Sequence, residues 1–234
     1  HLCHLASAYY PSGFKDSLVI SYDGMGEIDT CQFAFIKKNK IKIIKSENIF
    51  PNSLGLIYSA ITDYLGWKHH CDEGIIMGLA PFGNPESIIS KKNTETFSEI
   101  FKKIITISTK NPLNIIINTD WIDYHKNYNT WVSKKFLKVF GKKRKYLDKI
   151  TLKHKNIAAA LQKRLEEIVI YQLKYLKQKT NIDKLCIAGG VGLNCSLNGR
   201  IEKEKIFSQI FIQPASGDSG VAYGSCLIST IKRK

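Results

Sequence analysis

Arginine is scarce in this chain, although the chain has a strongly positive net charge. Of 35 basic residues only four are arginines, and the formal net charge is +15. Arginine is the side chain that recognises phosphates and bases in a bidentate manner, so its scarcity argues against a dedicated nucleic-acid surface. We interpret the lysines as a solvated surface. The densest basic run, residues 142–145, stays open as a contact for an anionic substrate.

Long apolar runs and paired cysteines are also absent. No apolar run approaches the roughly 20 residues that span a bilayer, and the first residues do not form a basic segment followed by an apolar one. We expect no membrane association and a cytoplasmic location. The six cysteines form no C-x-x-C pair, and several lie in apolar runs. We therefore expect reduced thiols and no disulfides.

What the chain does contain is enough apolar sequence for one core or two small lobes, since 44% of its 234 residues are hydrophobic. Its most informative stretch is residues 185–194, LCIAGGVGLN, a short apolar run followed by a glycine-rich loop. This order is typical of a buried strand that brings its carboxyl end to a ligand. Gly189 and Gly190 would expose backbone N–H groups to a phosphate there. A tight turn without a ligand explains the same pattern.

Two aspartates occupy glycine-containing turns at the ends of predicted strands. Asp23 follows the strand predicted at 17–22, and Asp218 follows the strand predicted at 210–213. Each side chain has a local explanation, because Asp caps its own turn or the next helix. Each would also suit a phosphate or metal site beside the loop at 189–194.

Two histidines begin a predicted N-terminal helix. His1 and His4 precede the small apolar residues of a packed helix. A spacing of three residues is workable for a metal, and a partly exposed helix end is the alternative. Because a domain rarely starts within a helix, we expect the chain to be a fragment. The strand that should precede this helix would lie upstream.

The remaining pattern predicts alternating strands and helices, hence an α/β fold with parallel strands. Further strands are expected at 31–37 and 40–45. Ser53 is the expected N-cap of an apolar-striped helix, and Gly55 in its first turn is a possible nucleotide contact, although core packing alone explains the helix. Residues 84–152 show weak signals, a helix near 95–107 and a strand near 114–117, and we expect them to form a peripheral, variable insertion. Residues 157–176 carry the clearest helical stripe, and a helix closes the chain.

Six motifs, in order and spread over nearly the whole chain, resemble the N-terminal domain of the O-carbamoyltransferase family, which includes nodulation and antibiotic carbamoyltransferases. They are HLCHLASAYYPSGF, YDGMGE, FPNSLGLIYSAITDYLG, DEGIIMGLAPFG, LCIAGGVGLNCSLNGR and QPASGDSGVAYGSCL. The resemblance implies an actin-like (ASKHA, ribonuclease H-like) transferase domain of α/β class, related to the enzymes that place threonylcarbamoyl on tRNA. It also implies that this chain, residues 1–234, is one partial domain.

The resemblance implies roles for individual residues. His4 matches the second histidine of the family's H-x-x-x-H metal pair, whose first histidine would precede His1. Asp23 and Asp218 match the carboxylates that complete an iron site, so these three residues are the expected metal ligands and catalytic residues. The nucleotide is expected near the residues that match the family's adenylate contacts, Ser53, Gly55, Gly189, Gly190 and Asn194. By ligand type alone, manganese, iron and zinc all suit imidazole plus carboxylates.

The implied reaction is carbamoyl transfer from carbamoyl adenylate to a hydroxyl of a sugar-like or secondary-metabolite acceptor. In the family, a C-terminal domain makes carbamoyl adenylate from carbamoyl phosphate and ATP. We expect that domain, and the upstream strands of the first lobe, to be missing here, so the fragment alone should be inactive. Metal and backbone N–H groups would stabilise the developing oxyanion, and no amino-acid nucleophile is required.

Two further functions stay open. One is a nucleotide- or nucleic-acid-binding module akin to the tRNA-modifying relatives, suggested by the charge of +15. The other is a nucleotide-binding domain without catalysis, suggested by Ile75, which stands where the family usually has lysine in E-G-K-x-M-G-L-A. The acceptor's identity is expected to depend on residues 84–152 and on the missing lobe.

Overall fold

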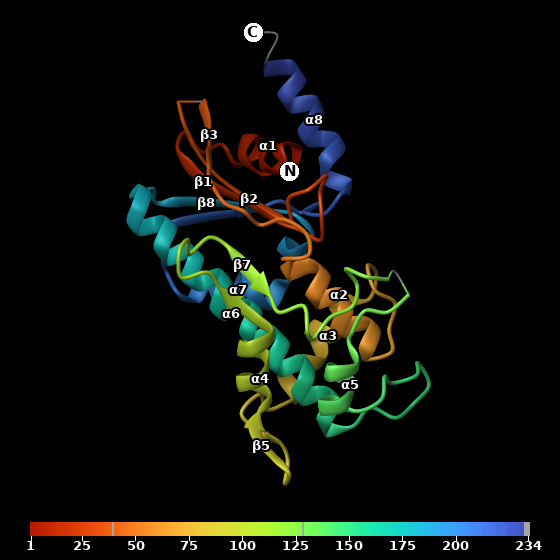
Figure 1. Cartoon of the computed structure of the whole chain (residues 1–234). Helices are drawn as coiled ribbons and strands as arrows, with labels where there is room; N and C mark the ends of the chain where they lie inside the picture. Colours follow the sequence, from red (N-terminus) through yellow and green to blue (C-terminus); the bar gives the residue numbers. More distant parts are fainter. Residues whose placement is uncertain (39, 128, 232–234) are drawn as a thin grey trace.

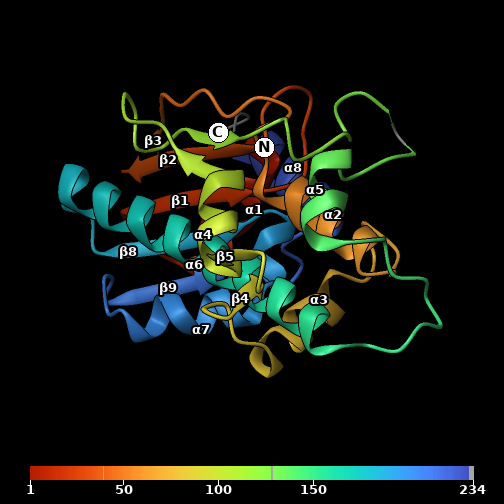
Figure 2. The same cartoon turned by 60° about the horizontal axis from the view of Figure 1, so that its bottom comes forward.

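The computed structural model describes residues 1–38, 40–127 and 129–231. A five-stranded mixed sheet runs through the described chain in the order β3-β2-β1-β8-β9 (Figure 1). Figure 2 shows these strands one above another, with the long helix α6 in front of them. The strands of this sheet are β1 (Ser17–Tyr22), β2 (Cys31–Lys37), β3 (Lys40–Ile44), β8 (Lys184–Ala188) and β9 (Gln209–Ile212). The sequence prediction of an α/β fold is confirmed.

Helices cover both faces of this sheet, and two small hairpins lie apart from it. The helices are α1 (Leu2–Ser12), α2 (Leu54–Tyr64), α3 (Glu73–Leu79), η1 (Ala80–Phe82), α4 (Phe97–Ile104), α5 (Lys134–Phe140), α6 (Leu152–Thr180), η2 (Gly190–Leu193), α7 (Cys195–Lys203) and α8 (Ser219–Ile231). The hairpins pair β4 (Ile88–Ser90) with β5 (Asn93–Thr96) and β6 (Ile105–Ile107) with β7 (Ile115–Ile117).

The central strand β1 is buried along its whole length and has one antiparallel and one parallel neighbour. It pairs antiparallel with β2 and parallel with β8, which in turn pairs parallel with β9. Because successive strand side chains point to opposite faces, β1 supplies both cores. Leu18 and Ile20 belong to the larger core under α6, whereas Val19 belongs to the smaller core under α1. The parallel strands β1, β8 and β9 consequently end at one edge of the sheet.

One face of the sheet carries α1 and α8, and the other carries α6 and α7 (Figure 1). The two helices on the first face pack backbone against backbone. A Cβ on Gly224 of α8 would lie 1.9 Å from the carbonyl oxygen of Cys3 in α1, so only glycine fits. This close packing holds the N-terminal helix beside the loop that follows β9.

Residues 84–152, which we expected to form a peripheral, variable insertion, contribute side chains to the main core. Phe97, Phe101, Trp121 and Phe136 are at most 4% exposed and belong to the same hydrophobic cluster as α2 and α6. The weak sequence periodicity of this segment arises because short helices and two-strand hairpins, rather than one long element, deliver these side chains. Whether the segment is variable among relatives stays a prediction.

Element boundaries follow the sequence prediction at most places. The predicted strands at 17–22 and 31–37 coincide with β1 and β2. The helix expected near 95–107 is shorter, because residues 105–107 form β6 and pair with β7. After the short turn η2, helix α7 begins at Cys195, because Asn194 caps it.

Two structural observations bear on the expectations about membranes and disulfides. The described residues include no helix with the length and apolar character needed to cross a membrane. All six cysteines are free thiols, and Cys31 and Cys186 are buried.

Candidate metal and nucleotide site

Three loops meet where the parallel strands end. Asp23 follows β1, residues 189–194 follow β8, and Asp218 lies in the loop between β9 and α8. The carboxyl edge of parallel strands is where open α/β sheets place ligands. The fold therefore brings together predicted site residues that are far apart in the sequence.

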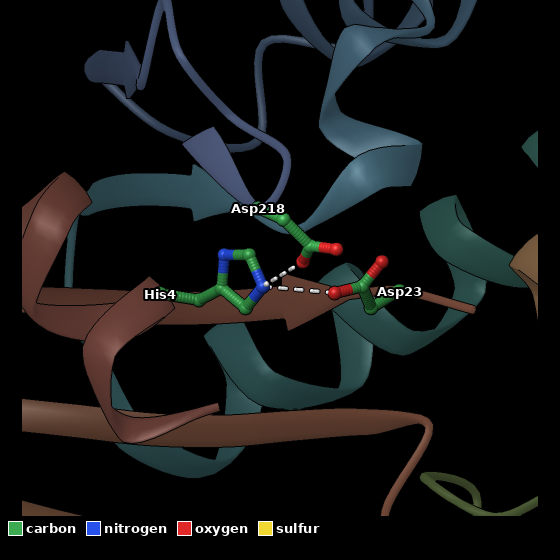
Figure 3. A group of neighbouring side chains, drawn as sticks. All are labelled: His4, Asp23 and Asp218. Carbon is green, nitrogen blue, oxygen red and sulfur yellow. Dashed lines mark ion pairs between the residues drawn. The ribbon is translucent and has the colours of Figure 1, made fainter. Parts of the chain in front are cut away.

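His4, Asp23 and Asp218 form a compact group at this edge (Figure 3). His4 Nε2 lies 2.8 Å from Asp23 Oδ2 and 3.5 Å from Asp218 Oδ1. One nitrogen or oxygen atom from each of the three residues falls within 4.8 Å of the others. Figure 3 shows the imidazole pointing from α1 toward both carboxylates.

Asp23 is fixed by backbone donors on its second oxygen. Its Oδ1 accepts hydrogen bonds from the N–H groups of Gly24, at 2.8 Å, and Gly190, at 3.2 Å. Burial raises the pKa of Asp23, but the hydrogen bonds from His4 and Gly24 outweigh burial and lower the pKa below its ordinary value. The carboxylate is therefore held ionised, with one oxygen directed at the group.

The other two members differ sharply in exposure. The side chain of His4 is 4% exposed, whereas that of Asp218 is 94% exposed. His4 Nδ1 is buried and has no hydrogen-bond partner within the described residues, so helix packing and Asp23 orient this ring. His1 is engaged elsewhere, because its Nε2 donates to the Asp29 carbonyl at 2.7 Å. The group is closed on the helix side and open at Asp218.

Gly189 permits the close approach of two strand ends. Its φ is +86°, and a Cβ there would lie 2.1 Å from the carbonyl oxygen of Tyr22. Its N–H donates to the Ser216 carbonyl at 2.8 Å, and the Ser216 hydroxyl donates to the Gly189 carbonyl at 3.0 Å. Gly189 thus joins the ends of β1, β8 and β9 and does not itself line the cavity described below, whereas Gly190 does.

Ser53 and Gly55 hold the Asp23 loop against the start of α2. The Ser53 hydroxyl accepts from Leu56 N–H at 3.0 Å, as predicted for an N-cap, and it lies 2.6 Å from the Gly24 carbonyl to which it donates. A Cβ on Gly55 would lie 2.6 Å from the Asp23 carbonyl oxygen. Ser53 is buried behind the cavity wall, and Gly55 is part of that wall.

Asn194 is held by two structural contacts. Its Oδ1 accepts from Leu197 N–H at 2.9 Å and caps α7. Its amide also pairs with that of Gln162, with nitrogen–oxygen distances of 2.9 and 3.0 Å in the two directions. Gln162 further accepts from the Tyr58 hydroxyl at 3.0 Å. The sequence did not identify Gln162, because it lies within the long stripe of α6 and no local motif marks it.

A cavity of about 840 Å³ opens beside the group. Asp23, Gly190 and Asp218 line one part, and the wall also includes a set of residues that sequence reasoning did not select, namely Phe50, Tyr58, Ser59, His69, His70, Tyr124 and Trp131. Within the described residues, its lining contains no lysine and no arginine. The basic side chains of the described chain therefore lie outside this cavity lining.

Two sequence features that bear on the alternative functions lie outside this cavity wall. Ile75 is 46% exposed and does not line the cavity, although its neighbours Glu73 and Gly74 do. In the basic run at 142–145, Arg144 is 4% exposed, and its guanidinium donates to the carbonyls of Tyr146 and Asp148. Arg144 is thus a structural residue of the run.

The three clustered side chains fit a divalent transition metal by their donor chemistry. One imidazole nitrogen and two carboxylate oxygens at this spacing suit such an ion, and the open side at Asp218 leaves room for a further ligand. The N–H groups of Gly24, Gly189 and Gly190 are engaged within the protein, so these glycines offer a ligand close approach of the backbone.

Taken together, the structure is an α/β domain with two features at the carboxyl edge of its parallel strands. One is the cluster of His4, Asp23 and Asp218, which we call the metal-type group, and the other is a ligand-sized cavity. The family model described as the carbamoyltransferase N-terminus matches residues 1–227. The chain belongs to the carbamoyltransferase family and corresponds to its N-terminal region.

The chain is also similar to individual proteins. An uncharacterized protein of Synechocystis is 35% identical over 228 residues, covering 97% of this chain and 35% of that protein. Nodulation protein NolNO of Sinorhizobium fredii is 32% identical over 230 residues, covering 97% of this chain and 30% of that protein. The chain spans about a third of the length of these curated relatives. A crystal structure of HypF in the phosphate- and nucleotide-bound form aligns with a TM-score of 0.48 at 13% identity, covering 98% of this chain and 42% of that one.

Proposed function

We propose that this chain is the carbamoyl-transferring part of an O-carbamoyltransferase, which moves a carbamoyl group from carbamoyl adenylate to a hydroxyl of a sugar-like or secondary-metabolite acceptor. Membership of the carbamoyltransferase family supports the transfer of a carbamoyl group. The observation that carries the proposal is the convergence of His4, Asp23 and Asp218 at the mouth of a ligand-sized cavity.

In this proposal His4, Asp23 and Asp218 hold a divalent metal, Fe²⁺ by resemblance to the family. When bound, such an ion supplies positive charge that neutralises phosphate oxygens and polarises the transferred carbonyl. Asp23 is suited to the task because two backbone N–H groups fix its Oδ1 and leave Oδ2 directed at the group. Asp218, which is exposed, gives the group its open side.

The adenylate would lie along the glycine loop. Gly190 lines the cavity beside Asp23, and Gly55 brings the start of α2 against the neighbouring Asp23 loop. Ser53, Gly189 and Asn194 would act by shaping this wall, since their polar groups are engaged in contacts within the protein.

The reaction balances without a protein nucleophile. The acceptor oxygen forms a bond to the carbamoyl carbon, the bond from that carbon to the phosphate oxygen breaks, AMP leaves, and the proton of the acceptor hydroxyl is released to water. Fixing both reactants in one cavity of about 840 Å³ supplies the orientation that such a transfer needs.

We extend the proposal to the rest of the protein and its setting. Carbamoyl phosphate and ATP would be supplied to a C-terminal adenylate-forming domain outside this chain, and the enzyme would work in the cytoplasm. The actin-like (ASKHA, ribonuclease H-like) ancestry is supported by the sheet order, an antiparallel β1–β3 meander followed by two parallel strands. The cavity wall, which has no lysine or arginine among its described residues, does not favour the nucleic-acid alternative.

The test uses the complete gene product with carbamoyl phosphate, ATP, Fe²⁺ under anaerobic conditions and a panel of hydroxylated acceptors. We expect acceptor-dependent release of AMP and a carbamoylated product by mass spectrometry, both lost in Asp23→Asn. Asp120→Asn, an exposed carboxylate paired with Lys135, serves as the control. Turnover of neither carbamoyl phosphate nor ATP across the panel would exclude the proposal.

A further inference from the structure

One part of the cavity wall is built almost entirely from aromatic rings. We call Phe50, Tyr124, Trp131, His69 and His70 the aromatic wall; all five line the cavity. Their rings form a continuous chain, with centroid distances of 6.1 Å from Phe50 to Tyr124, 5.9 Å from Tyr124 to Trp131 and 4.3 Å from Trp131 to His69. This surface is distinct from the loops that carry the metal-type group.

The aromatic wall is anchored, so its shape is defined before any ligand binds. The Tyr124 hydroxyl donates to the Pro51 carbonyl at 2.8 Å. The Trp131 carbonyl accepts from Asp123 N–H at 3.1 Å. Trp131 is 8% exposed, which leaves little freedom for its ring. A wall of fixed aromatic rings with few polar groups is a common design for binding small molecules.

Polar groups accompany this wall at two points. His69 Nδ1 is buried and without a hydrogen-bond partner in the described part of the chain. The Glu73 carboxylate, which also lines the cavity, is fixed by the Ser59 hydroxyl at 2.5 Å and by His70 N–H at 2.6 Å. Buried polar atoms normally find partners, so the unpaired nitrogen of a residue that lines the cavity is a candidate partner for a ligand hydroxyl.

The carboxylates of the cavity lining disfavour a phosphorylated ligand at the aromatic wall. The described lining includes the carboxylates Asp23, Glu73 and Asp218 and no lysine or arginine, although the chain carries a net charge of +15. Burial, aided by the neighbouring His70, lowers the pKa of His69, so this ring is neutral at neutral pH. A phosphate placed on the aromatic wall would meet Glu73, whereas Lys143, the cation whose charge acts on His69, is paired with Asp63 and lies outside the lining.

We propose that the aromatic wall is the acceptor subsite and that it selects an uncharged, hydroxyl-bearing ring, which stacks on Trp131 and hydrogen-bonds to His69. This inference rests on the proposed function and deepens it. Aromatic faces bury the apolar face of such a ring, and the imidazole satisfies one of its hydroxyls. Trp131 and His69 are thus specificity-determining residues, and the wall rejects phosphorylated rings.

The experiment compares a neutral probe, methyl β-D-glucopyranoside, with a phosphorylated one, glucose 6-phosphate. Binding to the 234-residue chain is measured by saturation-transfer NMR and by titration of the tryptophan indole N–H signals. We expect the neutral glucoside to bind at least about fivefold more tightly than the phosphate. Trp131→Leu and His69→Leu should each weaken glucoside binding by about fivefold or more. Tyr223→Leu, an exposed tyrosine on α8 outside the cavity lining, should not change it.

The same samples are titrated with Mn²⁺, which tests the metal-type group independently. Equal or tighter binding of glucose 6-phosphate would overturn the inference. Undiminished glucoside binding in His69→Leu would overturn it as well, and this variant serves as the test if Trp131→Leu does not fold. Mn²⁺ binding without any glucoside binding would refute the acceptor subsite and leave the proposed function standing. Glucoside binding without Mn²⁺ binding would instead refute the metal part of the proposed function.

Discussion

His4 Nε2 lies 2.8 Å from Asp23 Oδ2, with the imidazole in helix α1 and the carboxylate at the end of strand β1. Asp218 Oδ1 approaches the same nitrogen at 3.5 Å. Two carboxylates around one imidazole concentrate negative charge that a divalent cation would neutralise.

The first prediction concerns metal binding by this group. Asp23→Asn should weaken Mn²⁺ binding to the purified chain by about tenfold or more, because an amide removes an anionic ligand that backbone N–H groups hold in place. Isothermal titration calorimetry measures the change. Asp120→Asn, which removes an exposed carboxylate outside the group, should bind Mn²⁺ like the wild type. Equal losses in both variants would mean that Mn²⁺ is held by general surface charge.

The second prediction compares two glycine-to-alanine substitutions. Gly55→Ala should lower the free energy of unfolding by about 1–3 kcal/mol, because its Cβ would lie 2.6 Å from the Asp23 carbonyl oxygen and force the loop to move. Gly74→Ala, whose Cβ meets nothing within 4 Å in helix α3, should be neutral or stabilising by up to about 1 kcal/mol. Urea unfolding followed by circular dichroism gives both values. A stable Gly55→Ala protein would contradict the close packing of α2 on this loop.

The third prediction concerns pH and His154 at the start of α6. Burial, followed by the nearby Arg144, lowers the pKa of His154 below its ordinary value of 6.5, and its Nδ1 accepts a hydrogen bond from Thr151 N–H at 3.1 Å. The unfolded chain therefore binds a proton more readily. The stabilisation from neutral His154 is full above pH 6.5 and is lost as the pH falls from 6.5 through the folded-state pKa.

Replacing His154 separates its hydrogen bond at the start of α6 from the effect of its protonation. Glutamine at this position can also bond back to the N-cap backbone but carries no titratable proton. His154→Gln should therefore flatten the loss of stability below pH 6.5 while changing the unfolding free energy little at pH 8. Urea unfolding at a series of pH values tests this. An unchanged pH profile would show that other groups dominate the titration.

The fourth prediction concerns Gln162, a buried residue of α6 that hydrogen-bonds to several side chains. Gln162 bonds to Tyr58, Asn194 and Glu166. Gln162→Leu should cost about 1–3 kcal/mol of unfolding free energy, because buried partners lose their hydrogen bonds. Gln178→Leu places the same change at an exposed position of the same helix and should cost far less. Thermal unfolding by calorimetry distinguishes the two, and similar losses would argue that Gln162 contributes only helix propensity.

Local sequence patterns predicted much of the secondary structure. Alternating and continuous apolar runs located β1 and β2 at their observed ends, and Ser53 was identified as the N-cap of α2. These features depend on neighbours within a few residues, which the sequence displays directly. The glycine pattern at 189–194 likewise predicted a strand followed by a tight loop. The roles expected for His4, Asp23 and Asp218 came from the order of six motifs, since each residue alone had a plain structural explanation.

Only the tertiary structure revealed the aromatic wall and the core position of residues 84–152. Phe50, His69, Tyr124 and Trp131 come from separate segments and form one cavity surface. Gln162 is buried at a polar hub although its helix shows an ordinary apolar stripe. Such contacts join residues that are distant along the chain, so their existence depends on how strands and helices pack. The sequence by itself determined the local elements and the chemistry available at strand ends, and tertiary packing decided which of those groups meet.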